Sequence, residues 1–291
     1  MVQSLSLGKG EKRMAGVVSL WKAYEKDTLD KVQGKNNGNI KELVADSHYR
    51  KIGERAFKNN TKLRRVILPE NVVEIGAQSF YNTMLREVEL KGTILIRKEA
   101  FYNCTKLKQV KLPKTTNFIG NRAFAQCKSL ERMEIDVGSI CREVKAEAFS
   151  GCVNLKHIAL PATLEKIERR AFYKCTALEQ IVLPDRLREI GAEAFYQNAL
   201  TSLELPEGLI KIGDSAFLKC NSLQYAKIPS TVKVIEKWAF HGCNRLKVLE
   251  IGHDPEEIGP WVINRSAKIR CKKGGAVEKY CRDSGFETEY I

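Results

Sequence analysis

Cysteine and histidine are the residues of this sequence that could do the most chemistry, as nucleophiles, metal ligands or disulfide partners. The 291-residue chain contains nine cysteines and four histidines. Asn60 and Asn198 stand at the position that most of the cysteines occupy, three residues after a phenylalanine. We therefore expect a buried ladder of side chains that hydrogen-bond nearby backbone groups. The cysteines of this ladder are Cys104, Cys127, Cys152, Cys175, Cys220 and Cys243.

The residues alone leave three states open for this cysteine ladder. A zinc site favours C-x-x-C spacing or a mixed His/Cys cluster, and the sequence has neither. Stacked neighbours would lie close enough for disulfides, but their parallel side chains would not converge and the number of cysteines is odd. We expect reduced, buried thiols, with disulfides and a metal site as the alternatives. Reduced thiols fit a cytoplasmic or anaerobic setting.

The histidines give no catalytic pattern. None lies in an H-E-x-x-H motif, and the sequence has no G-x-S-x-G, P-loop or G-x-G-x-x-G motif. We therefore predict that the chain is not an enzyme and needs no cofactor. His157 is interpreted as a solvated residue on the exposed side of a strand. The other three are His48, His241 and His253.

The cysteines belong to an internal repeat. An Ala-Phe or Ser-Phe dipeptide recurs at intervals of 21 to 25 residues, and a leucine after it opens a short alternating segment such as "LKQVKLP" or "LEQIVLP". Such a repeat is typical of a solenoid, because one unit cannot bury its own apolar face whereas stacked units can. The repeated phenylalanines are Phe57, Phe80, Phe101, Phe124, Phe149, Phe172, Phe195, Phe217 and Phe240.

The alternating segments predict the strands that position everything else. Each should pair in parallel with the equivalent segments of the coils before and after it. Proline closes six of these segments, where it ends the ladder and turns the chain. The phenylalanines should fill the core layer by layer, beside a short helical or 3₁₀ turn. The solvent-facing third and fifth positions, such as Gln109 and Lys111, then form one surface, which we name the strand face.

This repeat resembles a known family. The pattern φ-x-x-I-G-x-x-A-F-x-x-C-x-x-L-x-x-φ-x-φ-P runs through residues 40 to 260 and resembles the BspA-like leucine-rich repeats of bacteria and some protists. The last twenty residues, "KKGGAVEKYCRDSGFETEYI", resemble the helix-then-strand cap of many members. The resemblance implies a curved, right-handed leucine-rich repeat solenoid that binds proteins or surfaces without catalysis. It also implies a family in which many members are cell-surface proteins.

Both ends of such a solenoid need caps, because open ends expose core residues and strand edges. The apolar spacing over 17–32 predicts a capping helix within an N-terminal segment, 1–38. The solenoid itself, of about ten coils, should span 39–265, and a C-terminal cap with a helix over 276–284 should span 266–291. Two coils are irregular in length: "LKGTILIRKEAF" is short and lacks the proline, and "IDVGSICREVKAEAF" has two extra residues.

The charge of the chain points to no single partner. Its 49 basic and 35 acidic residues give a net charge of +14 but are interspersed, which indicates a diffuse solvated surface. Binding of an acidic polymer is the alternative, although no row of aromatic residues accompanies the basic ones as in platforms for single-stranded nucleic acid. No apolar stretch is long enough to span a membrane. No signal peptide is evident, so we expect a cytoplasmic location, or the cell surface if a leader was removed.

The strand face is where we expect a partner to bind. Its middle stretch carries the least charge, and one tyrosine is its only aromatic residue, a composition found at interfaces. Ordinary solvated strand residues are the alternative interpretation. We predict a monomeric binding scaffold for an unidentified protein, with acidic-polymer binding or cell-surface adhesion as the other candidate functions. The predicted contact residues are His157, Ala159, Gln180, Val182 and Tyr225.

Overall fold

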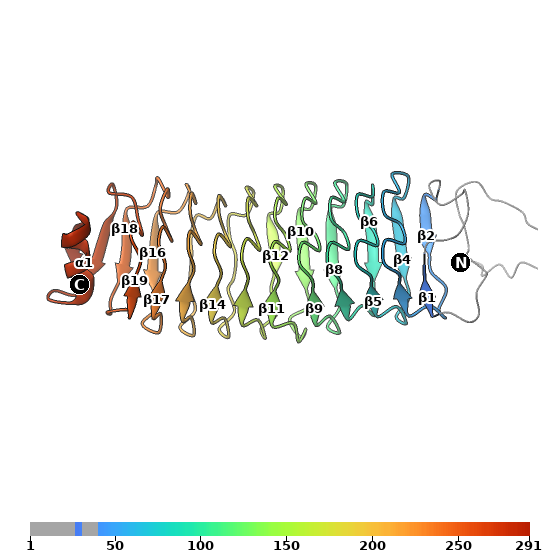
Figure 1. Cartoon of the computed structure of the whole chain (residues 1–291), viewed down its shortest axis with the longest axis horizontal. Helices are drawn as coiled ribbons and strands as arrows, with labels where there is room; N and C mark the ends of the chain where they lie inside the picture. Colours follow the sequence, from blue (N-terminus) through green and yellow to red (C-terminus); the bar gives the residue numbers. More distant parts are fainter. Residues whose placement is uncertain (1–26, 31–39) are drawn as a thin grey trace, which may run out of the picture.

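The computed structural model describes residues 27–30 and 40–291, which form an elongated solenoid (Figure 1). Successive coils lie side by side along the long axis, and every strand pair between described residues is parallel, as in β10 (Arg132–Ile135) with β8 (Gln109–Leu112). Equivalent residues of neighbouring coils face each other: Arg132 pairs with Gln109 on one side and with His157 on the other. The predicted solenoid of stacked parallel strands is confirmed.

Two-residue strands form one side of the solenoid, which we name the short-strand stack. Most of them end in an apolar residue that is buried, as Ile190 is. A sheet of five and a sheet of six make up this stack. The five are β1 (Thr28–Leu29), β3 (Lys51–Ile52), β5 (Glu74–Ile75), β7 (Leu95–Ile96) and β9 (Phe118–Ile119). The six are β11 (Glu143–Val144), β13 (Lys166–Ile167), β14 (Glu189–Ile190), β15 (Lys211–Ile212), β17 (Val234–Ile235) and β19 (Glu257–Ile258).

Longer strands carry the strand face on another side of each coil. They form three separate sheets, so the ladder is interrupted between β6 and β8 and again between β12 and β16. The predicted alternating segments 179–183 and 201–205, which lie in the second gap, form no strand. The remaining long strands are β2 (Glu42–Val44), β4 (Arg65–Leu68), β6 (Glu87–Leu90), β12 (His157–Ala159), β16 (Tyr225–Ile228), β18 (Val248–Ile251), β20 (Lys268–Cys271) and β21 (Glu287–Tyr290).

Tight turns that contain the Ala-Phe dipeptide connect the short strands to the long ones. Arg170 and Lys174, two residues before and after Phe172, both have a φ of 57°, in the left-handed region. The Phe172 N–H donates to the Ala194 carbonyl of the next coil at 2.8 Å, whereas the Cys175 N–H donates back to Phe172 at 3.3 Å. Because alternate N–H groups bond across coils, these turns take the place of the short helical turns that the sequence predicted.

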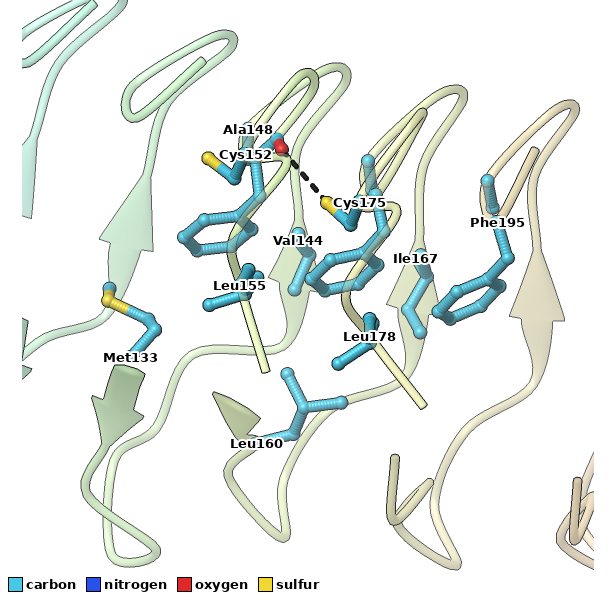
Figure 2. Close-up of a cluster of buried hydrophobic side chains, with 14 of the residues drawn as sticks. Met133, Val144, Ala148, Cys152, Leu155, Leu160, Ile167, Cys175, Leu178 and Phe195 are labelled. Atoms are coloured by element: carbon cyan, nitrogen blue, oxygen red, sulfur yellow. Dashed lines mark hydrogen bonds between the residues drawn. The ribbon is translucent and has the colours of Figure 1, made fainter. Parts of the chain in front are cut away.

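A single column of phenylalanine rings fills the core. Nine rings stack from Phe57 to Phe240, with neighbouring centroids 5.0 to 5.7 Å apart and ring planes within 12° of each other. Leucine and isoleucine side chains surround the rings, as Figure 2 shows around Leu155, Leu178 and Ile167, of which Ile167 lies on β13. This confirms that the repeated phenylalanines fill the layers of the solenoid.

The two ends of the described chain differ from each other. At the C-terminal end, α1 (Ala276–Ser284) stops at Gly285, which has a φ of 71°, and β21 extends the sheet by pairing with β20. The helix predicted over 17–32 is wrong at Thr28–Leu29, which is strand β1. Those residues pair with β3, and Leu29 is buried against the core. The rest of that predicted helix lies outside the described residues.

Candidate interaction surface

The cysteine ladder is part of the framework behind the strand face. The Cys175 Sγ donates to the carbonyl of Phe149 in the preceding coil at 3.2 Å (Figure 2), and the Cys152 Sγ donates to Phe124 at 3.1 Å. Asn198 makes the equivalent bond through Nδ2 to Phe172 at 2.8 Å, which explains why asparagine and cysteine share one position. All nine cysteines are free and buried, and burial raises the pKa of the Cys152 thiol to about 12. Burial also raises the pKa of the Cys175 thiol, so Cys152 and Cys175 are protonated hydrogen-bond donors.

His157 and Ala159 lie on β12, and both side chains are exposed. They line a hollow of about 360 Å³ together with Glu134 and Val137. Val137 belongs to the predicted insertion of two residues, which forms a loop with Val137 71% and Ile140 61% exposed. The insertion therefore places exposed apolar side chains beside the predicted strand-face residues.

Gln180 and Val182 lie in the gap between the sheets. Both are exposed, and Val182, at 84%, is the most exposed of the large apolar side chains in the described chain. The main chain around them carries few bonds to neighbouring coils: the Thr201 N–H donates to Glu179 at 3.0 Å, but Glu179 makes no equivalent bond to Lys156 among the described contacts. Val182 therefore projects from a segment whose polar backbone groups also face solvent.

Tyr225 lies at the start of β16, beyond the gap. Its ring is 43% exposed and lines a hollow of about 550 Å³ with Leu203, Leu205 and Lys227. Its hydroxyl donates to Glu250 Oε2 at 2.9 Å, so the ring is held in place while one side stays open. Partial burial and this bond raise the pKa of Tyr225.

Glu250 anchors that tyrosine through a small charged network. Arg270 Nη1 lies 3.2 Å from Glu250 Oε2, and Lys227 Nζ lies 3.4 Å from Oε1. Partial burial alone would raise the pKa of Glu250, but the hydrogen bonds from Tyr225, Arg270 and Lys227 outweigh it and lower that pKa. An aromatic ring fixed by a buttressing carboxylate is pre-organised for binding, because little side-chain entropy remains to be lost.

The structure thus places the five predicted residues on one side of the solenoid but not in one continuous site. His157 and Ala159 share a hollow, Tyr225 lines another, and Gln180 and Val182 lie between them. Sequence reasoning missed the gaps in the long-strand ladder and a third hollow at the first gap. A signal for the first gap was present, since the short coil that lacks proline connects β6 to β8.

The described residues show no sign of other site chemistry. Among them no three His, Cys, Asp or Glu side chains gather where a metal ion could be held. None of the helices formed by these residues has the length and apolar character needed to cross a membrane.

Comparison with known proteins agrees with this architecture. A family profile described as "BspA type Leucine rich repeat region" matches residues 34–143 and 142–270, with six copies. A solved leucine-rich repeat protein from Bacteroides ovatus is 23% identical, with a TM-score of 0.56, over 96% of this chain and 91% of that one. The pneumococcal vaccine antigen PcpA is 21% identical, with a TM-score of 0.55, over 87% and 77% of the two chains. These likenesses show the fold, and no curated protein sequence gives a significant match.

Proposed function

Because the chain belongs to the BspA-type leucine-rich repeat family, we propose that it is a non-enzymatic scaffold that binds a protein partner through the strand face. The observation that carries the proposal is the ring of Tyr225, exposed above a hollow yet fixed by Glu250. Exposed, pre-oriented aromatic residues are the commonest energetic centres of protein interfaces. Val182 and the loop at Val137 add apolar area nearby.

The surrounding charges fit a modest, specific interface. Arg132, Glu134 and Lys227 are partly or fully exposed around the apolar residues, as rim residues are in known complexes. Rim charges of mixed sign raise the rate of encounter and select orientation more than they add affinity. Binding through this face should therefore weaken only gradually as salt is added, unlike binding to a long polyanion.

Two substitutions test the proposal by capture of the native partner. Tyr225→Ala removes the ring, and Val182→Glu places a charge on the most exposed apolar position; each should weaken capture by about tenfold or more, the effect of losing one interface centre. Tyr225→Phe keeps the ring but loses the bond that fixes it to Glu250, so it should weaken capture less than Tyr225→Ala does. Thermal unfolding should be nearly unchanged in all three variants, because these side chains point to solvent.

Trp238→Ala provides the matched control. Trp238 lies in a turn, away from the long strands, and is 41% exposed, close to the exposure of Tyr225. Its loss should leave capture unchanged. If instead Trp238→Ala weakens capture while Tyr225→Ala and Val182→Glu do not, the partner binds the turns and the proposal is wrong.

A further inference from the structure

A large hollow lies at the first gap in the long-strand ladder. It has a volume of about 880 Å³ and extends across the beginnings of β6, β8, β10 and β12. Five cationic side chains and two carboxylates line it, with His157 at its edge. The cations are Arg86, Lys106, Lys108, Arg132 and Lys156, and the carboxylates are Glu87 and Glu131.

Most of these cations have no anionic partner within the described chain. Arg132 lies 3.5 Å from Glu134, but Arg86, Lys106, Lys108 and Lys156 make no ion pair with any described residue. The short-strand stack is different, because several of its cations are paired across coils. Lys166 lies 2.8 Å from Glu189, and Arg97, next to β7, lies 2.7 Å from Glu74. Of the two carboxylates, Glu87 is paired with Arg65 at 3.3 Å. The hollow is therefore left with uncompensated positive charge.

Two main-chain N–H groups beside this hollow make no bond to the preceding coil. In neighbouring coils the equivalent N–H groups donate to carbonyls of the preceding coil. The Arg86 N–H donates to the carbonyl of Arg64 at 2.8 Å, and the Glu131 N–H donates to that of Lys108 at 2.8 Å. The N–H groups of Lys108 and Gln109 make no such bond to Arg86. Among the described residues they make no other main-chain hydrogen bond. Two N–H donors beside uncompensated cations make a site for an anion, as in other backbone anion sites.

We propose that this hollow binds an acidic peptide segment, rich in Asp or Glu, of the protein partner; the inference rests on the proposed scaffold function. Carboxylates of the segment would be held by Lys106, Lys108 and the free N–H groups. A peptide fits better than a uniform polyanion for two reasons. The unpaired Glu131 would repel a polyanion, whereas a peptide backbone can donate N–H groups to it. The row of cations is also short, because the equivalents of Lys108 in the second gap are Glu179 and Thr201.

A labelled synthetic peptide of alternating Asp and Ser tests the site by fluorescence anisotropy at low ionic strength. The wild-type chain should bind it, and should bind the matched Asn-Ser peptide at least about tenfold more weakly, since charge-assisted bonds are lost. The double variant Lys106→Gln/Lys108→Gln should lose at least about tenfold in affinity for the acidic peptide.

The control variant removes two positive charges from the equivalent positions of a different repeat. Arg245 and Lys247 flank Leu246 as Lys106 and Lys108 flank Leu107, but there the ladder is intact, with the Lys247 N–H bonded to Gln224 at 2.9 Å. Arg245→Gln/Lys247→Gln should bind the peptide like wild type. Equal losses in both double variants, or absence of peptide binding, would overturn the site.

Heparin, a polyanion, tests the alternative occupant of the hollow. If heparin binds the wild type far more tightly than the peptide and loses affinity in Lys106→Gln/Lys108→Gln, the hollow is a polyanion site and the peptide proposal is wrong. These outcomes are separate from the scaffold proposal, because capture of the native partner can still depend on Tyr225 and Val182 when the peptide does not bind.

Discussion

At the scale of single residues, the cysteine ladder shows what the sequence could and could not predict. The exchange of cysteine for asparagine at one position predicted a buried side chain that bonds the backbone, and the bonds of Cys175 and Asn198 confirm it. The identity of the acceptor was not predictable. It is a phenylalanine carbonyl of the preceding coil, 26 residues away in both cases, and only the stacking of coils brings it within reach.

The ladder thiols should be inert in the folded protein. An ordinary thiol has a pKa near 8.5, so a fraction ionises at pH 8, whereas burial raises the pKa of Cys152 to about 12 and that of Cys175 well above its usual value. Iodoacetamide at pH 8 should leave both unmodified until denaturant is added, when both should react fully. Peptide mass spectrometry gives the modified fraction, and rapid labelling of Cys152 in the native state would contradict the buried ladder.

At the scale of elements, the phenylalanine column carries much of the stability. Phe172 stacks on two rings, with centroids 5.4 and 5.2 Å away, whereas Phe57 stacks on one ring, Phe80. Phe172→Ala should lower the free energy of unfolding by about 3–5 kcal/mol, through lost burial and the cavity that remains. Phe57→Ala should lower the free energy of unfolding by less. Urea unfolding measures both, and equally small losses would show that the rings are not layer fillers.

The second gap in the long-strand ladder could not be predicted from the repeat. The segment "LEQIVLP" has the same alternation as "LKQVKLP", yet residues 179–183 form no strand whereas Gln109–Leu112 is β8. Strand pairing depends on the spacing between neighbouring coils, and the residues of a single coil do not determine that spacing. The proposed strand-face site was likewise predictable only as a set of exposed positions, since each of its hollows is lined by residues of more than one coil.

Hydrogen exchange tests the second gap directly. The amides of 180–183 and 202–205 lack the ladder bonds that protect β10 and β16, so they should exchange at least about tenfold faster than the amides of those strands. Short digestion fragments measured by mass spectrometry resolve these segments. Equal protection across all four segments would mean that the ladder is continuous in solution.

At the scale of the whole molecule, the solenoid presents different chemistry on its different sides. In the short-strand stack, ion pairs connect neighbouring coils. The strand face instead has unpaired cations near β8 and a fixed, exposed tyrosine at β16. Because stacked coils hold equivalent positions in register, these features form a fixed surface pattern rather than a set of mobile side chains. We therefore expect a protein partner to bind this strand face.

Side-chain footprinting of the chain alone and in complex with its captured partner tests that claim most directly. Hydroxyl-radical labelling modifies exposed aromatic rings, and among the described residues three rings have similar exposure: Tyr225 at 43% on the strand face, and Trp238 at 41% and Trp261 at 43% in turns. Complex formation should protect Tyr225 and leave both tryptophans as reactive as in the free chain. Protection of Trp238 and Trp261 with Tyr225 still labelled would contradict that claim.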